Sequence, residues 1–230
     1  MTDPGESSAA DGSPRTVLIA GVGPVIGTAT AREFAAAGWQ VALLARSASL
    51  IEDLASSLPT EAHAVQADVT DPDAVADAVA SVEAAVGAPD CLVHNASAPG
   101  TPGLADCSPE QFRTTWAVRA FGAFLLARTV ADRLRRGETT FIVSGTTYAT
   151  EPTGDQIGWD SGAAAARGLV HSIAADGGDA VYVAIGARIA EGDTAGPAAI
   201  PARAVARTYR SLAVADDTVA RGVDVTLTPR

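Results

Sequence analysis

The sequence predicts a single α/β domain, in which a doubly wound parallel sheet of seven strands is flanked by helices. Short runs rich in valine, isoleucine and leucine alternate with longer helical patterns, as in successive β-α-β units. Three long loops follow the fourth, fifth and sixth runs, at strand ends where open α/β sheets bind ligands. With 230 residues, 47% of them hydrophobic, the chain can bury one substantial core.

The individual elements follow from periodicity and from residues that begin or end helices. Several expected helices begin at Ser, Asp or Pro, and Gly38 is placed to end the first one. The expected strands are 16–20, 40–45, 62–67, 91–95, 139–144, 180–185 and, more weakly, 223–227. The expected helices are 26–37, 49–58, 71–86, 109–135, 159–176 and 201–212, and the long loops are 96–108, 145–158 and 186–199.

Composition excludes several classes of protein. A net charge of −11 and the lack of a basic run argue against nucleic-acid binding. No stretch approaches the roughly 18 apolar residues of a membrane span, so we expect a soluble, cytoplasmic protein. Residues 1–14 are expected to form a disordered tail without a signal-peptide core, leaving 15–230 as the domain. Cys91 and Cys107 are too few for a disulfide framework or a zinc site, and we expect no metal.

A glycine-rich turn directly after the first strand resembles a dinucleotide-binding turn. The segment AGVGPVIG, residues 20–27, leads into a helix whose free N–H groups can hold a pyrophosphate. Arg46 ends the second strand, where a guanidinium can pair with a 2′-phosphate and favour NADP(H) over NAD(H). Asp68 and Val69 follow the third strand, where they can contact adenine. The alternative is that the glycines serve only packing and that Arg46 is simply solvated.

Together with HNAS at residues 94–97, these motifs make the chain similar to the short-chain dehydrogenase/reductase (SDR) family. That family has Thr-Gly-x-x-x-Gly-x-Gly in the first turn, Asp-Val after the third strand and Asn-Asn-Ala-Gly after the fourth. The resemblance implies a Rossmann-type fold and a cofactor site, and Thr194 resembles a threonine that contacts nicotinamide. Val25 replaces the middle glycine, so its side chain is expected to crowd the pyrophosphate. The implied cofactor residues are Gly21, Val25, Ile26, Gly27, Arg46, Asp68, Val69, Asn95, Ala96 and Thr194.

The resemblance also implies a proton relay of Ser, Tyr, Lys and Asn, and here the sequence departs from the family. All sixteen basic residues are arginine, so the chain contains no lysine. The tyrosine and lysine positions fall on Trp159 and Ala163, and a shift of one residue gives Asp160 and Ala164. The serine position falls on Thr146 or Thr147, which keep a hydroxyl, and the asparagine position falls on Arg119. We therefore expect the standard relay to be absent.

Other residues are weaker catalytic candidates with plainer structural alternatives. Tyr148, Thr147 and Asp160 are possible replacements for the relay, and His94 and His171 are weak general-base candidates. Arg119 has two interpretations: it holds an anionic substrate, or it forms a structural ion pair with Asp155 or Asp160. The ion pair is the preferred expectation.

Three functions remain open from sequence. The first is an atypical enzyme of small-molecule metabolism, of the secondary-metabolism kind, either NADP(H)-linked or catalysing a redox-neutral cyclisation, elimination or isomerisation. The second is a non-catalytic subunit that pairs with an active SDR through the helix at 159–176, with alanines at 163–166. The third is a ligand-sensing regulator. We expect a homodimer or homotetramer, or a hetero-oligomer with an active SDR.

Overall fold

The computed structural model describes residues 12–191, 198–215 and 224–229. Its main sheet has the strand order β3-β2-β1-β4-β5-β6-β9, and every neighbouring pair is parallel. The strands are β1 Thr16–Ala20, β2 Gln40–Ala45, β3 Ala62–Gln66, β4 Cys91–His94, β5 Thr140–Thr146, β6 Ala180–Ile185 and β9 Asp224–Leu227. This confirms the predicted doubly wound fold, with strand ends that differ by one or two residues from expectation.

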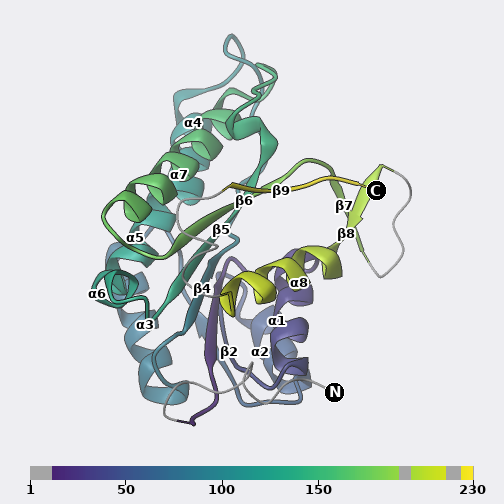
Figure 1. Cartoon of the computed structure of the whole chain (residues 1–230). Helices are drawn as coiled ribbons and strands as arrows, with labels where there is room; N and C mark the ends of the chain where they lie inside the picture. Colours follow the sequence, from purple (N-terminus) through teal and green to yellow (C-terminus); the bar gives the residue numbers. More distant parts are fainter. Residues whose placement is uncertain (1–11, 192–197, 216–223, 230) are drawn as a thin grey trace.

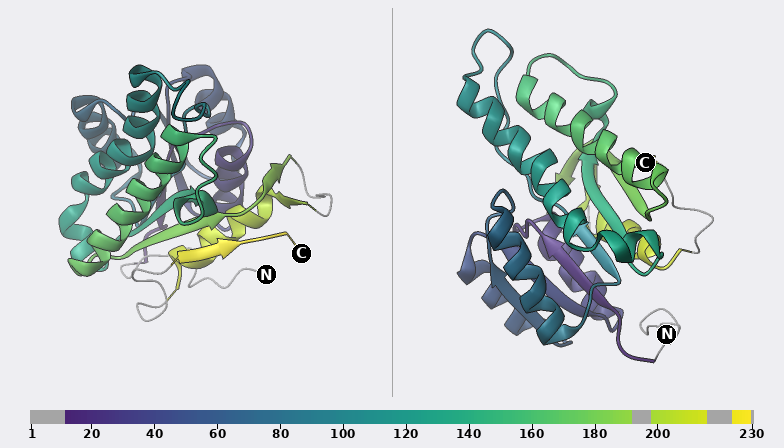
Figure 2. Two further views of the ribbon diagram at one scale, coloured as in Figure 1. Left: turned by 90° about the horizontal axis from the view of Figure 1, so that it is seen from above. Right: turned by 90° about the vertical axis from the view of Figure 1, so that its left-hand side faces the viewer.

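Helices cover both faces of the sheet, as Figures 1 and 2 show. One face packs against α1 (Ile26–Ala36), α2 (Ala48–Ser57) and α8 (Ala202–Ala213), and the other against α3 (Pro72–Val86), α5 (Gly122–Thr129) and α7 (Ile157–Ala175). Alternate residues of a strand point to opposite faces. In β1, accordingly, Val17 and Ile19 pack on the face covered by α1, α2 and α8, while Leu18 and Ala20 pack on the face covered by α3, α5 and α7. A central strand buried on both faces must be apolar throughout.

Short-range signals in the sequence set the helix ends. Gly38 has a φ of +88°, and the N–H groups of Gly38 and Trp39 donate to the carbonyls of Ala35 and Phe34, a Schellman ending. The Asp71 side chain accepts from two N–H groups of the first turn of α3. Ser108 and Gln111 form a capping box at the start of α4 (Pro109–Trp116).

The prediction of one uninterrupted helix at 109–135 is wrong. After α4 the chain forms a π-helical turn, η1 (Ala117–Phe121), and then α5, and it breaks at Val130 before α6 (Ala131–Arg135). Apolar periodicity does not reveal a π turn, because one inserted residue shifts the helix face without ending the pattern. Close packing fixes the position of α5, since a Cβ on Gly122 would lie 3.0 Å from Cγ2 of Val69.

Two of the three expected loops contain short structured segments. The loop after β5 includes a 3-10 turn, η2 (Thr147–Ala149). The segment after β6 contains β7 (Arg188–Ala190), which pairs with β8 (Ala199–Pro201) in a separate two-stranded sheet beside α8 (Figure 1). Short paired strands of three residues carry too little alternation to be recognised from sequence.

A glycine at the end of β5 makes room for a buried tyrosine. A Cβ on Gly145 would lie 2.0 Å from Cζ of Tyr182, whose side chain is 1% exposed. The Tyr182 hydroxyl accepts from the Thr146 N–H at 3.0 Å and donates to the Thr146 carbonyl at 3.2 Å. The Tyr182 side chain on β6 therefore holds the end of β5 in position.

Replacing Gly145 with alanine is expected to destabilise the fold by about 1–3 kcal/mol, because the added methyl overlaps a fixed ring. The matched control is Gly168→Ala in α7, where an added Cβ meets nothing within 4 Å. That control is expected to be neutral or stabilising by up to about 1 kcal/mol. Urea unfolding of both variants measures the difference, and equal stability of the two would show that the Tyr182 ring moves freely.

Candidate functional site

A cleft of about 710 Å³ lies at the carboxyl ends of the strands and is lined by the segments that follow β1 to β6. This is the edge where open parallel sheets bind ligands. Most sequence-predicted residues line it: Gly21, Val25, Ile26, Gly27, Arg46, Asp68, Val69, Asn95, Ala96, Arg119, Thr146, Thr147, Tyr148 and Trp159. Thr194 lies outside the described residues, and Ala163 and Asp160 are not part of the lining.

The two matching glycines of the first turn are required by packing. Gly21 has a φ of +83°, and a Cβ there would lie 2.2 Å from the backbone of Ala96. A Cβ on Gly27 would lie 2.8 Å from Cα of Val22. The side-chain amide of Asn95 donates to the Gly21 carbonyl at 3.0 Å, so this asparagine ties the first turn to the end of β4. These contacts exist with or without a nucleotide.

The start of α1 nevertheless offers an anion site. In the described part of the chain, the N–H groups of Gly23, Val25, Ile26 and Gly27 have no hydrogen-bond acceptor. No side chain caps this helix, and its first turn holds no acidic residue. Free N–H groups and the positive end of the helix dipole favour a phosphate at this point. Val25 is the N-cap residue directly before α1, and its branched side chain stands beside these free donors.

Arg46 and Asp68 lie at the neighbouring strand ends. Arg46 is exposed, and Asp68 accepts hydrogen bonds from Thr70, through N–H at 2.9 Å and Oγ1 at 2.8 Å. The Thr70 N–H is the main cause that lowers the pKa of Asp68, against an opposing effect of burial, and the hydroxyl of Thr70 and the Arg46 guanidinium add to it. Asp68 is therefore an anion at neutral pH, and Val69 behind it is buried.

Arg119 is the unusual charge of the cleft. The π turn η1 carries it, and its side chain is 6% exposed. Its Cζ lies 3.9 Å from the centroid of the Trp159 ring, and Nη1 donates to Oγ of Ser97 at 3.0 Å. Burial lowers the pKa of Arg119, while the nearby Tyr182 and Asp160 oppose that shift. An arginine remains protonated under such conditions, so this is a buried permanent cation.

The preferred expectation for Arg119, an ion pair with Asp155 or Asp160, is wrong. Within residues 12–191, 198–215 and 224–229, no carboxylate lies within 4.0 Å of its nitrogens. Asp155 instead accepts a hydrogen bond from the Thr153 hydroxyl. Asp160 is buried and accepts from the N–H groups of Thr153 at 3.1 Å and Gly154 at 3.4 Å. Donors nearby in sequence therefore hold both carboxylates, the Thr153 hydroxyl for Asp155 and two backbone N–H groups for Asp160.

Trp159 is positioned by a loop from a distant part of the sequence. Oγ1 of Thr101 accepts from the N–H groups of Gly158 at 2.8 Å and Trp159 at 3.3 Å, at the start of α7. Four residues after Trp159, Ala163 is fully buried and presents no functional group. The Arg119 side chain lies against the same helix, because a Cβ on Gly162 would be 3.4 Å from its Cδ.

Hydroxyl groups line the end of β5. Thr146, Thr147 and Tyr148 all border the cleft, and Oγ1 of Thr146 accepts from the Tyr148 N–H at 3.4 Å. The other two tyrosines are in the core: Tyr182 as described, and Tyr209, which is fully buried and donates to Oγ of Ser144 at 2.7 Å. Burial raises the pKa of Tyr209 well above its ordinary value. Tyr148 is thus the one tyrosine of this chain at the cleft.

The two candidate histidines lie outside the cleft lining. His171 on α7 contacts Oδ1 of Asp224 at 3.0 Å, and Nε of Arg167 donates to Oδ2 of the same carboxylate at 2.7 Å, which ties α7 to β9. His94 is 1% exposed at the end of β4, and neither ring nitrogen has a hydrogen-bond partner among the described residues. Burial, and then the Arg119 cation, lower its pKa to about 4, although the backbone of Val118 and Arg119 opposes the shift.

Sequence reasoning missed four polar residues of the cleft: Ser97 as the partner of Arg119, Ser144 near the end of β5, Gln156 at the start of α7, and Arg188 on β7. The only available signal was their position at a strand end or in the long loops that follow strands. Of the described residues that line the cleft, three are arginines, Arg46, Arg119 and Arg188, and one, Asp68, is a carboxylate. The lining is thus positive in a chain whose net charge is −11.

Two searches of the described residues were negative. No group of three His, Cys, Asp or Glu residues there is arranged to hold a metal ion. No helix in the described part is both long and apolar enough to span a bilayer.

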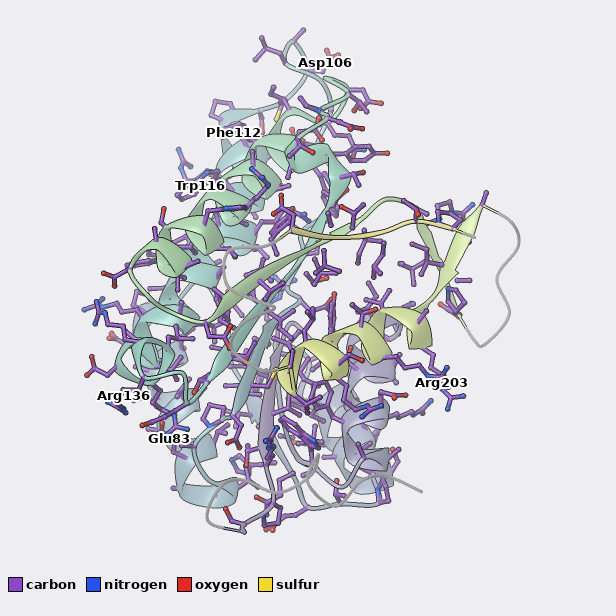
Figure 3. All side chains as sticks on the ribbon, viewed as in Figure 1. Glu83, Asp106, Phe112, Trp116, Arg136 and Arg203 are labelled. Atoms are coloured by element: carbon purple, nitrogen blue, oxygen red, sulfur yellow. The ribbon has the colours of Figure 1, made fainter. Side chains whose placement is uncertain are left out.

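A second, apolar groove of about 450 Å³ lies beside α4, away from the cleft. Phe112 and Trp116, labelled in Figure 3, line it from α4 and are 38% and 40% exposed, and Leu104 is 79% exposed. Exposed apolar clusters of this kind are typical of contact surfaces.

Comparison with known proteins agrees with the fold. Residues 15–188, more than half of the chain, match the family described as short chain dehydrogenase. Over 141 residues the chain is 36% identical to the short chain dehydrogenase mpl6 of Monascus purpureus, an alignment that covers 56% of this chain and 48% of that protein. The chain therefore belongs to the short-chain dehydrogenase/reductase family. It spans only about half the length of this curated relative.

Solved structures share the fold along nearly the whole chain. An alcohol dehydrogenase from the archaeon Thermococcus sibiricus, complexed with 5-hydroxy-NADP, superposes with a TM-score of 0.85 at 22% identity, covering 94% of this chain and 96% of that one. The NADPH-dependent 3-quinuclidinone reductase from Rhodotorula rubra superposes with a TM-score of 0.80 at 25% identity, covering 99% and 94%.

Burial of His94 predicts a specific loss of stability in acid. In the unfolded chain His94 binds a proton near pH 6.5, whereas in the folded chain it does so only near pH 4. The free energy of unfolding therefore has its full value above pH 6.5 and decreases as the pH drops toward 4. Across that window we expect wild type to lose about 3 kcal/mol relative to His94→Asn, which has no ring to titrate. Urea unfolding between pH 7 and 4.5 measures this.

The control is His63→Asn, which removes a ring that contacts the Ser81 hydroxyl at the surface and should leave the steep pH dependence unchanged. Parallel stability curves for wild type and His94→Asn would contradict the assignment, because His94 would then bind its proton equally well in the folded and unfolded states.

Proposed function

We propose that this chain is a small-molecule enzyme that binds NADP(H) in the cleft and works without the tyrosine and lysine relay of its family. One observation carries the proposal. A single cleft joins an anion site with free N–H groups at α1 to a buried cation, Arg119, stacked on Trp159 at the other end. The first feature suits a dinucleotide, and the second replaces the expected proton-transfer residues.

Three features support NADP(H) as the cofactor. The unsatisfied N–H groups of α1 suit a pyrophosphate, and Asp68 with Val69 lies where adenine is bound in this family. Arg46 at the end of β2 is exposed and available to a 2′-phosphate. The reductase from Rhodotorula rubra, which shares the fold at 25% identity, is described as NADPH-dependent. These residues fit the cofactor, and when bound it would supply a hydride donor or acceptor.

The absence of lysine and the positions of the tyrosines support an altered proton chemistry. No lysine exists in the chain to lower a tyrosine pKa, and two of the three tyrosines are in the core. The cleft residues that can act on a proton are Tyr148 and the hydroxyls of Thr146, Thr147 and Ser144. Under this proposal the proton comes from substrate or water during hydride transfer, or the reaction is redox-neutral and depends on positioning.

A non-catalytic subunit is the second candidate, favoured by the exposed apolar groove at Phe112 and Trp116. The alanine run on α7 supports it only partly, because Ala163 and Ala166 are buried and Ala164 is exposed. This alternative predicts that an intact family member copurifies with the chain and that the isolated chain forms weak homodimers or none.

Titration of the purified protein with NADPH and NADH by calorimetry tests the cofactor assignment. We expect Arg46→Gln to weaken NADPH binding about tenfold, by loss of one charge-assisted pair, and to leave NADH binding nearly unchanged. The control is Arg32→Gln, an exposed arginine of α1 away from the cleft lining. No binding of either nucleotide at millimolar concentration would exclude the hydride-transfer form of the proposal.

Substitution of Val25 with glycine tests the crowded pyrophosphate turn. Removing the branched side chain from Val25, the N-cap residue of α1, is expected to tighten NADPH binding by roughly threefold or more, because the backbone can then approach the phosphates. The same calorimetric titration measures it. Unchanged or weaker affinity would mean that the Val25 side chain points away from the bound pyrophosphate.

A further inference from the structure

The geometry points to a carboxylate site at Arg119: the small molecule that enters this cleft carries a carboxylate on an apolar body, and Arg119 binds it. This inference specifies the substrate class of the proposed function and rests on that function for its role in catalysis. The binding site itself is argued from contacts of Arg119 and is tested separately from NADP(H) binding.

The first argument is the set of donors that Arg119 leaves unused. Nη1 donates to Ser97, whereas Nε is buried with no hydrogen-bond partner and Nη2 has none either among the described residues. Nε–H and Nη2–H point the same way along one edge of a guanidinium, the edge that binds both oxygens of a carboxylate. Ser97 accepts from Nη1, which is not one of this pair. Nη2 is therefore the donor that a carboxylate meets first, and Nε, which the surrounding protein covers, completes the pair when the neighbouring atoms shift.

The second argument is electrostatic. A buried cation without a counterion is costly, and donors left unsatisfied add to that cost. Asp160, the nearest carboxylate with an electrostatic influence on Arg119, is more than 4.0 Å away and is held by the backbone of Thr153 and Gly154. Among the described residues that line the cleft, Asp68 is the only carboxylate, and it follows the end of β3. An incoming anion supplies the missing charge.

The third argument is rigidity and shape. Arg119 is fixed by the π turn, by the Trp159 ring on its face and by Gly162 beside its Cδ. Because the cation is already ordered, little side-chain entropy is lost when a ligand binds. Trp159 and the neighbouring Val118 add apolar surface beside Arg119, and Tyr148 and Ile185 add more to the lining of the same cleft. A ligand with a carboxylate attached to a ring or hydrocarbon matches both the Arg119 guanidinium and this apolar surface.

The test uses benzoate as the probe and benzamide as its neutral counterpart, titrated into the full chain by calorimetry with tryptophan fluorescence as the second signal. We expect wild type to bind benzoate at least tenfold more tightly than benzamide. Arg119→Gln should weaken benzoate binding about tenfold or more without changing benzamide, and Arg119→Lys should restore only part of it, because an ammonium lacks the planar fork. Trp159→Phe should remove the fluorescence response while benzoate heat remains.

The matched control is Arg128→Gln, an exposed arginine on α5 outside the cleft lining, which should bind benzoate as wild type does. Thermal unfolding of each variant establishes that it is folded, and Arg119→Lys keeps the buried charge if Arg119→Gln unfolds. Equal benzoate affinity in wild type and Arg119→Lys or Arg119→Gln overturns the inference. So does binding of inorganic phosphate that depends on Arg119 when benzoate does not bind.

Titration of the same samples with NADPH separates this inference from the proposed function. Benzoate binding that depends on Arg119 without any NADPH binding supports the carboxylate site and refutes the cofactor assignment. NADPH binding without benzoate binding refutes the carboxylate site and leaves the proposed function intact.

Discussion

The close approach of the turn after β1 to the segment after β4 is the constraint on which the cleft depends. These two strands are neighbours in the sheet, and the chain leaves them toward opposite faces, so a crevice opens between them. Gly21 in a left-handed conformation packs directly on Ala96, and Asn95 bonds back to the Gly21 carbonyl. A side chain at position 21 would separate the two segments. This contact holds the turn at the start of α1 in place, and the residues with free N–H groups line the crevice there.

The other end of the crevice depends on a different interaction, the stack of Arg119 on Trp159. The guanidinium comes from the π turn η1 and the indole from α7, so the pair joins two elements that are distant in sequence. A relay built on a lysine of α7 would place its cation on the same helix as its tyrosine. Here α7 contributes an aromatic ring and the buried Ala163, and the cation arrives from the neighbouring turn. The buried positive charge at this end of the crevice thus belongs to Arg119, which donates hydrogen bonds but does not release a proton.

Burial is the main reason that His94 stays neutral, and the buried Arg119 cation adds to it. A neutral imidazole at the end of β4 avoids both the cost of a buried charge and a second positive charge near Arg119. Asp68, in contrast, is held as an anion by Thr70 and Arg46 at the far end of the crevice. Asp68, with Arg46 beside it, therefore lies at the β3 end of the cleft, and the buried Arg119, with no carboxylate within 4.0 Å among the described residues, lies at the β5 and α7 end. This arrangement favours a ligand that presents different groups to the two ends.

Much of the fold was readable from sequence, because the strands of the main sheet are short, largely apolar runs and several helix ends carry a local signal, such as Gly38, Asp71 or Ser108. The cleft residues that directly follow strands, from Gly21 to Tyr148, were readable for the same reason, since parallel strands all end at one edge. The absence of lysine is likewise a property of the sequence alone. The tertiary structure decided the partners of Arg119, the burial of His94 and Asp160, and the π turn. Burial and pairing depend on contacts between segments such as Ser97, Trp159 and Thr101, whose separation along the chain gives no local pattern from which their proximity can be derived.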